Sequence, residues 1–346
     1  MTALELAREM GHEEVILVQD AAAGLCAVVA VHDTTLGPAV GGTRMRLYPT
    51  LDDAAVDALR LSRAMTYKAA LAEMPWGGGK AVILADPARD KTRALLVAYA
   101  RAIDRLGGRF HTGADMGIDG RDIAVMSRLT RYMSHTPPDA KVDTAELAAL
   151  GVFASIRAAA AEGGRTLEGL HVAVQGLGQV GYRLARMLHQ AGTRLTVADV
   201  ETRRAERAAE ELKATVVAPD AVYDVLADVF SPNAAGGILN DETLPRLRCR
   251  AVAGAANEQL LEPRHGDLLH ERGILYGPDY VVNAGGLLSL LFEQGQTDEE
   301  GIKHRVEAIG DRLSALWARA RSEGVPPHRL ADRMAEERLA AARRPR

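Results

Sequence analysis

The sequence is poor in cysteine and lacks long apolar runs, and both shortages narrow what the protein can be. Its only two cysteines, Cys26 and Cys249, lie far apart in no metal-binding spacing, so neither a disulfide framework nor a metal site is expected. The longest mostly apolar runs, residues 21–31 and 281–292, contain glycine and fall well short of the ~20 residues that span a bilayer. No basic segment followed by an apolar stretch opens the chain, so we expect no signal peptide and a cytoplasmic protein.

A large excess of either charge is also missing. The 346 residues carry 46 acidic and 42 basic side chains, for a net charge of −4, and this balance does not favour nucleic acid as a partner. Apolar residues make up 47% of the chain, which is enough for a sizeable core, and the length leaves room for two domains. The composition favours a globular protein with neither a nucleic-acid nor a membrane partner.

Lysine is rare, because only six of the 42 basic residues are lysines. A desolvated lysine can lose its proton near neutral pH, whereas arginine effectively cannot. Lys68 and Lys80 lie in apolar and glycine-rich surroundings, unlike three of the other lysines, which lie in charged stretches. Composition alone leaves open whether these two lysines are functional or ordinary surface residues.

Hydrophobic periodicity predicts an α/β protein. Apolar residues at steps of three and four over 52–74 predict a long helix, which the glycines at 77–79 break before a buried strand at 81–84. In the second half, short apolar strands alternate with helices, which predicts a doubly wound parallel sheet with helices on both faces. The other expected strands are 15–19, 25–32, 109–112, 170–175, 195–198, 215–217, 228–230, 251–254 and 274–276, and the other expected helices are 89–106, 144–162, 182–190, 203–212 and two beyond residue 302.

A glycine-spaced turn, Gly176-Leu-Gly-Gln-Val-Gly181, follows a predicted strand and opens a predicted helix. Gly176 permits the tight turn, Gly178 lets a pyrophosphate approach the backbone, and Gly181 allows the helix to pack closely on the strand. Gln179 and Val180 lie between them at the helix N-terminus, where backbone amides favour phosphate. The pattern predicts dinucleotide binding.

Asp199 strengthens this prediction because it ends the next predicted strand, 18 residues after Gly181. A carboxylate at this place can accept hydrogen bonds from both ribose hydroxyls and repels a 2′-phosphate, so it favours NAD over NADP. Arg203 and Arg204 follow closely and either temper that preference or lie on the solvated face of the next helix. The expected cofactor is NAD.

Hydride transfer also needs groups that hold the substrate and a base that takes up a proton, and three residues of the first half could serve. Lys68 lies in a predicted helix, where its ammonium can pair with a carboxylate. Lys80 follows three glycines, and desolvation there would lower its pKa toward that of a usable base. Asp115 leaves a strand and could accept a proton or orient an amine. Each residue taken alone also fits a structural role: a helix-surface charge, a strand-edge lysine or a turn aspartate.

Together these motifs resemble the Glu/Leu/Phe/Val dehydrogenase family, and within it the leucine, phenylalanine and tryptophan dehydrogenases. The resemblance runs from about Met10 to the last helix, with several separate blocks in the right order. The blocks are Gly37-Pro-Ala-Val-Gly-Gly-Thr-Arg-Met45, Met65-Thr-Tyr-Lys68, Gly77-Gly-Gly-Lys80, Asp115-Met-Gly117, Val174-Gln-Gly-Leu-Gly-Gln-Val-Gly181, Ala253-Gly-Ala-Ala-Asn257 and Pro278-Asp-Tyr-Val-Val-Asn-Ala-Gly-Gly286.

The resemblance implies a reversible oxidative deamination of an L-amino acid to a 2-oxo acid and ammonia, with reduction of NAD. It also implies that Lys68 holds the substrate carboxylate, that Lys80 is the general base that activates water, and that Asp115 manages proton transfer at the substrate amine. The further implied contacts are Gly41 and Gly42 at the floor of the substrate site, and Asn257 and Asn283 near the nicotinamide ribose or the substrate.

The same resemblance implies a division of labour along the chain. Residues 1–140 would form the substrate, catalytic and oligomerisation domain, and residues 141–324 a Rossmann-type NAD-binding domain, with a cleft between the two. A C-terminal helix at about 325–346 would pack back on the first domain. The boundary is expected near residues 136–145, in the loop around Thr136-Pro-Pro-Asp139. A homo-oligomer is implied as well, with dimer and octamer both open.

Four residues match the specificity pocket of the family: Val40, Gly113, Leu287 and Leu290. No lysine or serine pair is placed for a glutamate γ-carboxylate, so we expect an apolar substrate. Gly113 with Leu287 resembles the members that accept aromatic side chains, because a missing methyl group makes room for a ring. The expected substrates are Phe, Trp or Leu, although one methylene is worth only ~1–3 kcal/mol of discrimination.

One stretch departs from the pattern of the family. Members usually carry a threonine that contacts the nicotinamide carboxamide, and counting back from Gly151-Val152 places Ala148 at that position. Thr144, one helical turn away, either substitutes for it or the contact is lost. This departure puts cofactor affinity in question but does not involve Lys68, Lys80 or Asp115.

Two other functions are compatible with the sequence. A catalytically weak paralogue could bind NAD or an amino acid as a sensor, and Ala148 with its altered loop is what supports that reading. A dehydrogenase of hydroxy acids would need a catalytic histidine with an acidic partner. The candidates for that role, His265 and His270, fall in a segment predicted to be a solvent-facing helix.

Overall fold

The computed structural model describes residues 2–134 and 142–343, so the predicted boundary loop at 136–139 lies outside the described residues. The chain divides into two compact units. Unit 1 comprises Met1–Ala140 together with Ala335–Arg346, and unit 2 comprises Lys141–Met334.

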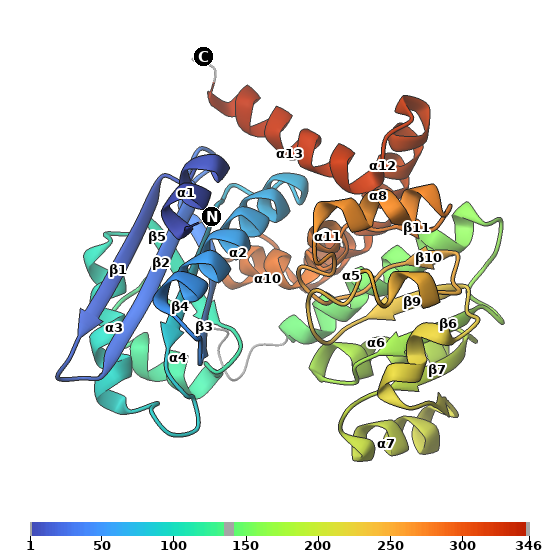
Figure 1. Cartoon of the computed structure of the whole chain (residues 1–346), viewed down its shortest axis with the longest axis horizontal. Helices are drawn as coiled ribbons and strands as arrows, with labels where there is room; N and C mark the ends of the chain where they lie inside the picture. Colours follow the sequence, from blue (N-terminus) through green and yellow to red (C-terminus); the bar gives the residue numbers. More distant parts are fainter. Residues whose placement is uncertain (1, 135–141, 344–346) are drawn as a thin grey trace. The chain divides into compact units, whose positions relative to one another are not determined.

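Unit 1 is built around a five-stranded mixed sheet (Figure 1). Its strands are β1 (Glu14–Asp20), β2 (Leu25–Asp33), β3 (Ala39–Arg46), β4 (Gly77–Leu84) and β5 (Phe110–Ala114), in the order β1-β2-β4-β3-β5. β2 is antiparallel to both β1 and β4, whereas β3 is parallel to both β4 and β5. The carboxyl ends of β3 and β5 therefore lie at one edge of the sheet.

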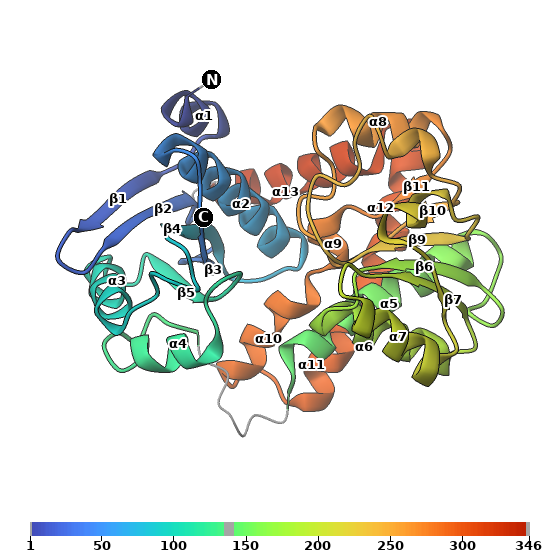
Figure 2. The same cartoon turned by 60° about the horizontal axis from the view of Figure 1, so that its bottom comes forward.

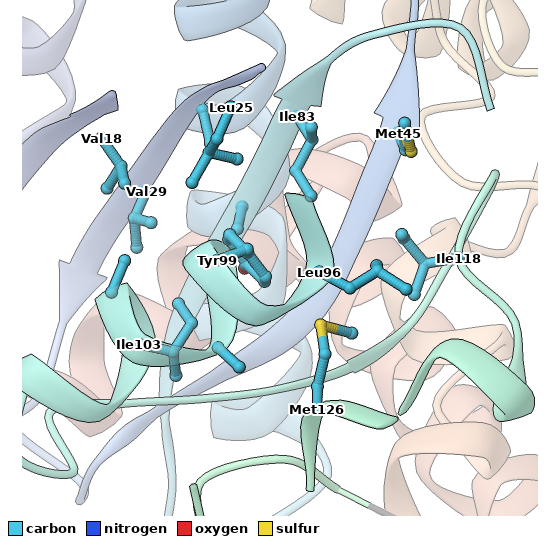
Figure 3. Close-up of a cluster of buried hydrophobic side chains, with 14 of the residues drawn as sticks. Val18, Leu25, Val29, Met45, Ile83, Leu96, Tyr99, Ile103, Ile118 and Met126 are labelled. Carbon is cyan, nitrogen blue, oxygen red and sulfur yellow. The ribbon is translucent and has the colours of Figure 1, made fainter. Parts of the chain in front are cut away.

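Four helices cover the two faces of this sheet: α1 (Ala3–Met10), α2 (Leu51–Leu71), α3 (Arg93–Arg105) and α4 (Gly120–Met126). Because successive side chains of a strand point to opposite faces, Val28 and Val82 pack with α1 and α2. Val29 and Ile83 point the other way, where they pack against Tyr99 of α3 (Figure 3). The alternation places two apolar cores, one on each side of the sheet.

Unit 2 holds a six-stranded sheet in which all neighbouring strands are parallel (Figure 2). Its strands are β6 (His171–Gln175), β7 (Arg194–Ala198), β8 (Thr215–Val216), β9 (Val229–Pro232), β10 (Ala251–Val252) and β11 (Leu275–Tyr276), in the order β11-β10-β9-β6-β7-β8. The chain builds from β6 outward to β8 and then returns to β9 on the other side of β6. This reversal makes the carboxyl ends of β6 and β9 a topological switch point, the place where such sheets bind ligands. The predicted fold class is confirmed.

The α-helices that begin in unit 2 are α5 (Thr144–Glu162), α6 (Gln179–Gln190), α7 (Thr202–Leu212), α8 (Pro263–Glu271), α9 (Asp279–Val282), α10 (Gly285–Glu293), α11 (Glu299–Glu307), α12 (Ile309–Glu323) and α13 (Pro327–Arg343). Two 3₁₀ turns, η1 (Pro219–Asp224) and η2 (Leu244–Arg246), connect strands. Within the described part of the chain, α5 alone is long and apolar enough to cross a membrane, but 56% of its apolar window is buried inside the protein. It packs against α6, α10 and α12, so it is a core helix of this unit.

Four of the predicted elements differ from the structure. The segment Ala39–Arg46 is a strand that was not predicted, and β4 begins at Gly77 instead of residue 81, so the glycines lie inside the sheet. The helix predicted from residue 89 begins at Arg93, because the Thr92 side chain accepts a hydrogen bond from the Leu95 amide and caps it there. The C-terminal segment forms three helices, α11 to α13, where two were predicted.

Candidate active site

Strand pairing in unit 1 brings Lys80 and Asp115 together. Thr43 of β3 pairs with Ala81 of β4 on one side and with Ala114 of β5 on the other. Lys80 and Asp115 are the chain neighbours of those two partners, so both lie beside β3. Because Ala81 faces the α3 core, Lys80 points to the opposite face of the sheet, the face that α2 covers.

Glycines make this close approach possible. A Cβ on Gly41 would overlap the carbonyl oxygen of Gly79 on the neighbouring strand. A Cβ on Gly42 would lie 2.9 Å from the Cβ of Asp115 and 2.9 Å from the carbonyl oxygen of Ala114. The two glycines predicted at the floor of the substrate site thus have a structural reason: each leaves space that a neighbouring strand or Asp115 occupies.

Lys80 and Asp115 form an ion pair in which the lysine is buried and the aspartate is partly buried. The Lys80 ammonium donates to Oδ2 of Asp115, while the Met116 amide donates to Oδ1 at 2.7 Å. The Lys80 side chain is 7% exposed and that of Asp115 is 22% exposed. Burial by itself raises the pKa of the Asp115 carboxyl, but the cations of Lys80 and Arg44 outweigh it and lower the pKa to about 2. Asp115 is therefore a carboxylate at neutral pH.

Lys68 lies in the last turn of α2 and is buried, with 9% of the residue exposed. It is therefore not the helix-surface charge that composition had left open. The turn before it packs tightly on β4, since a Cβ on Gly78 would overlap the backbone nitrogen of Thr66. The helix and the glycine-rich strand are thus in backbone contact two residues before Lys68.

The residues matched to the specificity pocket divide between the two units. In unit 1, Val40 of β3 is 7% exposed, and Gly113 of β5 pairs with Gly42. A Cβ on Gly113 would lie 3.3 Å from the Cβ of Ser134, which is tight but close to a normal contact. In unit 2, Leu287 of α10 is buried and Leu290 of the same helix is half-buried.

The predicted dinucleotide motif of unit 2 has the geometry that its sequence requires. Gly176 has a φ of +86°, and a Cβ on Gly181 would overlap the carbonyl oxygen of Gly176. Gly178 is the N-cap of α6 and supplies no side chain, and a Cβ there would meet nothing within 4 Å. The N-terminus of α6, with Gln179 and Val180 in its first turn, therefore opens onto free space at the carboxyl end of β6.

Asp199 lies beside this turn, as predicted. Its Oδ2 accepts a hydrogen bond from the Leu177 amide at 2.6 Å, and its Oδ1 accepts one from the Glu201 amide at 2.8 Å. The Arg204 guanidinium is 3.8 Å from the same carboxylate and is 54% exposed. A surface depression next to these residues is lined by Leu177, Gly178, Gln179, Tyr182, Arg183, Arg204 and Arg207.

Asn257 and Asn283 are in direct contact, because the Asn283 side-chain amide donates to Oδ1 of Asn257 at 2.9 Å. Oδ1 of Asn283 is buried and accepts no hydrogen bond from any described residue. Such an orphaned acceptor suits a ligand with an N–H or O–H donor. Together with the open helix N-terminus and Asp199, it fits a nicotinamide dinucleotide.

Ala148 of α5, which stands where the family pattern has a threonine, has Thr144 of the same helix nearby. Thr144 and Ala148 both lie next to Gly286, at 3.7 and 3.8 Å from the place where a Cβ would be. The Thr144 hydroxyl donates to the Ser289 hydroxyl at 3.4 Å. Thr144 thus presents a hydroxyl close to the place where the threonine of the family pattern is missing.

Two points were wrong or missed. His265 was expected on a solvent-facing helix, but it is fully buried, because its Nδ1 accepts the Glu262 amide at 3.0 Å and caps α8 from inside. Arg44 was quoted within a motif but given no role, although it lies beside Asp115. No local signal in the sequence marks it, because the strand that carries Arg44 was itself not predicted. No cluster of three or more metal-ligating side chains occurs among the described residues.

Comparison with known proteins covers both units. Residues 12–136 match the family described as "Glu/Leu/Phe/Val dehydrogenase, dimerisation domain". Residues 142–202 and 198–346 match the family described as "Glutamate/Leucine/Phenylalanine/Valine dehydrogenase".

Individual relatives match nearly the whole chain. Leucine dehydrogenase of Geobacillus stearothermophilus is 44% identical over 339 residues, which cover 97% of this chain and 92% of the relative. L-tryptophan dehydrogenase of Nostoc punctiforme is 45% identical over 347 residues, covering 99% and 98%. A crystal structure of that tryptophan dehydrogenase matches with a TM-score of 0.82 over 99% of both chains. Phenylalanine dehydrogenase of Thermoactinomyces intermedius is 42% identical over 341 residues, covering 97% and 93%.

Proposed function

The chain belongs to the Glu/Leu/Phe/Val dehydrogenase family, and from this premise we propose that it uses NAD, with Lys80 and Asp115 as the reacting side chains. The activity is that of an amino acid dehydrogenase: oxidative deamination of an apolar L-amino acid to the 2-oxo acid and ammonia. The observation that carries the assignment of residues is the Lys80–Asp115 ion pair beside the glycines of β3 and β4.

Each step of the reaction has a candidate group in unit 1. The Lys68 ammonium binds the substrate carboxylate, which a buried cation favours. The Asp115 carboxylate accepts a proton from the substrate amine, and it can do so because it is ionised at neutral pH. A nicotinamide cofactor, held by the α6 N-terminus, Asp199, Asn257 and Asn283, would supply the hydride acceptor for the α-carbon. Lys80 first releases its ammonium proton to solvent and then takes a proton from the water that attacks the resulting imine. The proton held by Asp115 passes back to the leaving nitrogen, and ammonia leaves as the carbonyl forms.

NAD is the proposed form of the nicotinamide cofactor. The groups that would hold it are the amides of the α6 N-terminus, the Asp199 carboxylate, and Asn257 with Asn283. Both oxygens of Asp199 are fixed by backbone amides, so the carboxylate is held in place where the adenosine ribose would lie. Arg204 is half exposed and weakly paired with Asp199, so it offsets only part of the repulsion of a 2′-phosphate.

The proposed substrates carry large apolar side chains, such as Phe, Trp or Leu. Val40 and Leu287 are apolar and buried, and Gly113 adds no side chain to β5. The relatives named for leucine, tryptophan and phenylalanine support this range but do not select within it. We further propose a homo-oligomer in the cytoplasm; the family description of residues 12–136 as a dimerisation domain supports the first part.

The test is the formation of NADH, followed by absorbance, with NAD and L-Leu, L-Val, L-Phe, L-Trp or L-Glu at alkaline pH. Lys80→Ala should abolish turnover of the apolar substrates while NAD still binds. Lys303→Ala is the matched control, because Lys303 is exposed on α11 and pairs only with Glu299 among the described groups. Its activity should equal that of the unchanged protein.

The alternative is a sensor that binds NAD or an amino acid without turning it over, which the loss of threonine at Ala148 favours. If no amino acid of the panel yields NADH while calorimetry still shows NAD binding, the sensor function is supported and the enzyme function is excluded for these substrates. If Lys80→Ala still turns over substrate, the activity is supported but Lys80 is not its general base.

A further inference from the structure

Asp115 has a second cationic neighbour besides Lys80. Arg44 lies on β3, between the strands that carry Lys80 and lead to Asp115, and its side chain is 11% exposed. Its Nε is 3.6 Å from Oδ2 of Asp115, the same oxygen that receives the Lys80 ammonium. That Nε is buried and makes no hydrogen bond to any described residue. A buried N–H without an acceptor is unfavourable, so this N–H can donate to Oδ2 of Asp115 once Lys80 no longer does.

The opposite side of the Arg44 guanidinium is firmly held. Its Nη1 donates to both oxygens of Asp57 on α2, at 3.0 and 3.3 Å. The Tyr48 hydroxyl donates to the same carboxylate of Asp57. Burial lowers the pKa of Arg44, but Asp115 and Asp57 outweigh it and keep the guanidinium charged. Burial and the bond to Asp57 raise the pKa of Tyr48 well above its usual value, so Tyr48 remains a donor.

The reaction needs a second cation at this place. When Lys80 gives up its proton to act as a base, Asp115 loses the charge that holds it ionised in a buried site. Arginine does not deprotonate in proteins, so its charge persists through that change. With Oδ1 held by the Met116 amide, the only oxygen left to reorient is the one that faces Arg44.

We propose that Arg44 is a positioning residue for the reaction: it takes over Oδ2 of Asp115 whenever Lys80 releases it, and so keeps Asp115 correctly oriented and favours its ionised form between the proton transfers. The Asp57 carboxylate and the Tyr48 hydroxyl form the clamp that aims Arg44. This role rests on the functions proposed for Lys80 and Asp115. Lys91 and Asp122 pair with each other at 2.8 Å. The cations that lower the pKa of Asp115 are therefore Lys80 and Arg44.

A purely structural role is the competing explanation, since Arg44 also ties β3 to α2 through Asp57. The two roles differ in the dependence of kcat/KM on pH. Removing a positive charge next to the Lys80–Asp115 pair makes the pair hold its protons more tightly. In a plot of kcat/KM against pH, the limb on which kcat/KM rises as the base loses its proton therefore moves to higher pH. A loss of packing alone lowers activity or stability without moving that limb.

The experiment compares pH profiles of kcat/KM for the best apolar substrate. Arg44→Gln should lower kcat and move the limb to alkaline pH by on the order of one unit. Arg44→Lys keeps the charge and should leave the limb in place while kcat still falls. Arg109→Gln is the matched control: Arg109 is 50% exposed, pairs with Glu13 and Glu14, and lies at the other end of β5 from Asp115. Its replacement should change neither kcat nor the pH profile.

Asp57→Asn supplies a test of opposite sign that survives poor folding of Arg44→Gln. It frees the guanidinium but makes the site more positive, so kcat should fall and the limb should move, if at all, to lower pH. A limb that stays in place in Arg44→Gln, or that moves to alkaline pH in Asp57→Asn, overturns the proposal. Activity that survives in Lys80→Ala overturns the proposed reaction itself, which is a separate failure.

Discussion

The Asp115 carboxylate is ionised because two cations on neighbouring strands outweigh its burial. In the folded protein its pKa is about 2, against 3.8 for an unperturbed group, so the folded state binds this proton less tightly than the unfolded state does. The stabilisation is therefore complete above about pH 4 and is lost as the pH falls through about 2. The charge state that suits catalysis also makes the folded unit acid-sensitive.

This linkage can be measured with Asp115→Asn. The shift of the pKa from 3.8 to about 2 corresponds to roughly 2 kcal/mol of unfolding free energy at neutral pH. Urea unfolding of the two proteins should show a difference in stability that shrinks by about that amount between pH 5 and pH 2. Differences that stay constant across this range would mean that Asp115 titrates normally. Repeating the series at 1 M salt separates this buried pair from exposed ion pairs, which salt screens.

Single residues were predicted from sequence where their chemistry was unusual for their surroundings. Lys68 and Lys80 stood out because lysine is rare here and because their neighbours are apolar or glycine. Arg44 did not stand out, since arginine is the common cation of this chain. The role of Arg44 depends on its distance from Asp115, and the two residues lie more than 70 positions apart in the sequence. Strand order creates that contact, and strand order is not visible in a local pattern.

At the scale of elements, glycines obscured one strand in the sequence and correctly indicated a turn in another place. Pro38 immediately before β3 and two glycines within it argue against a strand, so β3 was missed. The structure supplies the reason for the glycines, because side chains at Gly41 and Gly42 would collide with β4 and with Asp115. The glycines around Gly178 were placed correctly, because there the spacing belongs to a known turn between a strand and a helix.

A substitution at Gly178 can test cofactor binding without disturbing the fold. A Cβ at this position would meet nothing in the protein, and the residue has a φ of −67°, which alanine adopts easily. Gly178→Ala should therefore leave the thermal midpoint unchanged but fill the space in front of the α6 N-terminus. The Kd for NAD should rise at least about tenfold, equivalent to ~1.4 kcal/mol, in calorimetry.

The matched control for this variant is Gly120→Ala, at the N-terminus of α4 in unit 1, where an added Cβ also meets nothing within 4 Å. It should alter neither stability nor NAD binding. Gly181→Ala is the contrasting case, since its Cβ would overlap the carbonyl oxygen of Gly176 and should destabilise unit 2 itself. Unchanged NAD affinity in Gly178→Ala would place the pyrophosphate elsewhere.

At the scale of the whole molecule, the edge of the unit 1 sheet is the feature that points beyond the single chain. β1 pairs only with β2, so its outer backbone groups have no partner strand in the sheet. On this strand Val15 is 43% exposed and Leu17 is 50% exposed, both on the face opposite the residues that pack into the α3 core. An open strand edge with exposed apolar side chains favours association with another copy, and natural monomers usually protect such edges with charge.

Leu17→Glu tests whether this edge holds the proposed homo-oligomer together. A carboxylate in the middle of the apolar strip should repel its counterpart on a second copy and must be desolvated at any interface there. Light scattering after size exclusion should show the mass falling to that of a single chain. Leu226→Glu is the control, because Leu226 is 69% exposed on unit 2 and its replacement should leave the mass unchanged. If Leu17→Glu keeps the mass of the unchanged protein, assembly uses another surface; if both variants dissociate, the effect is one of net charge and not of β1.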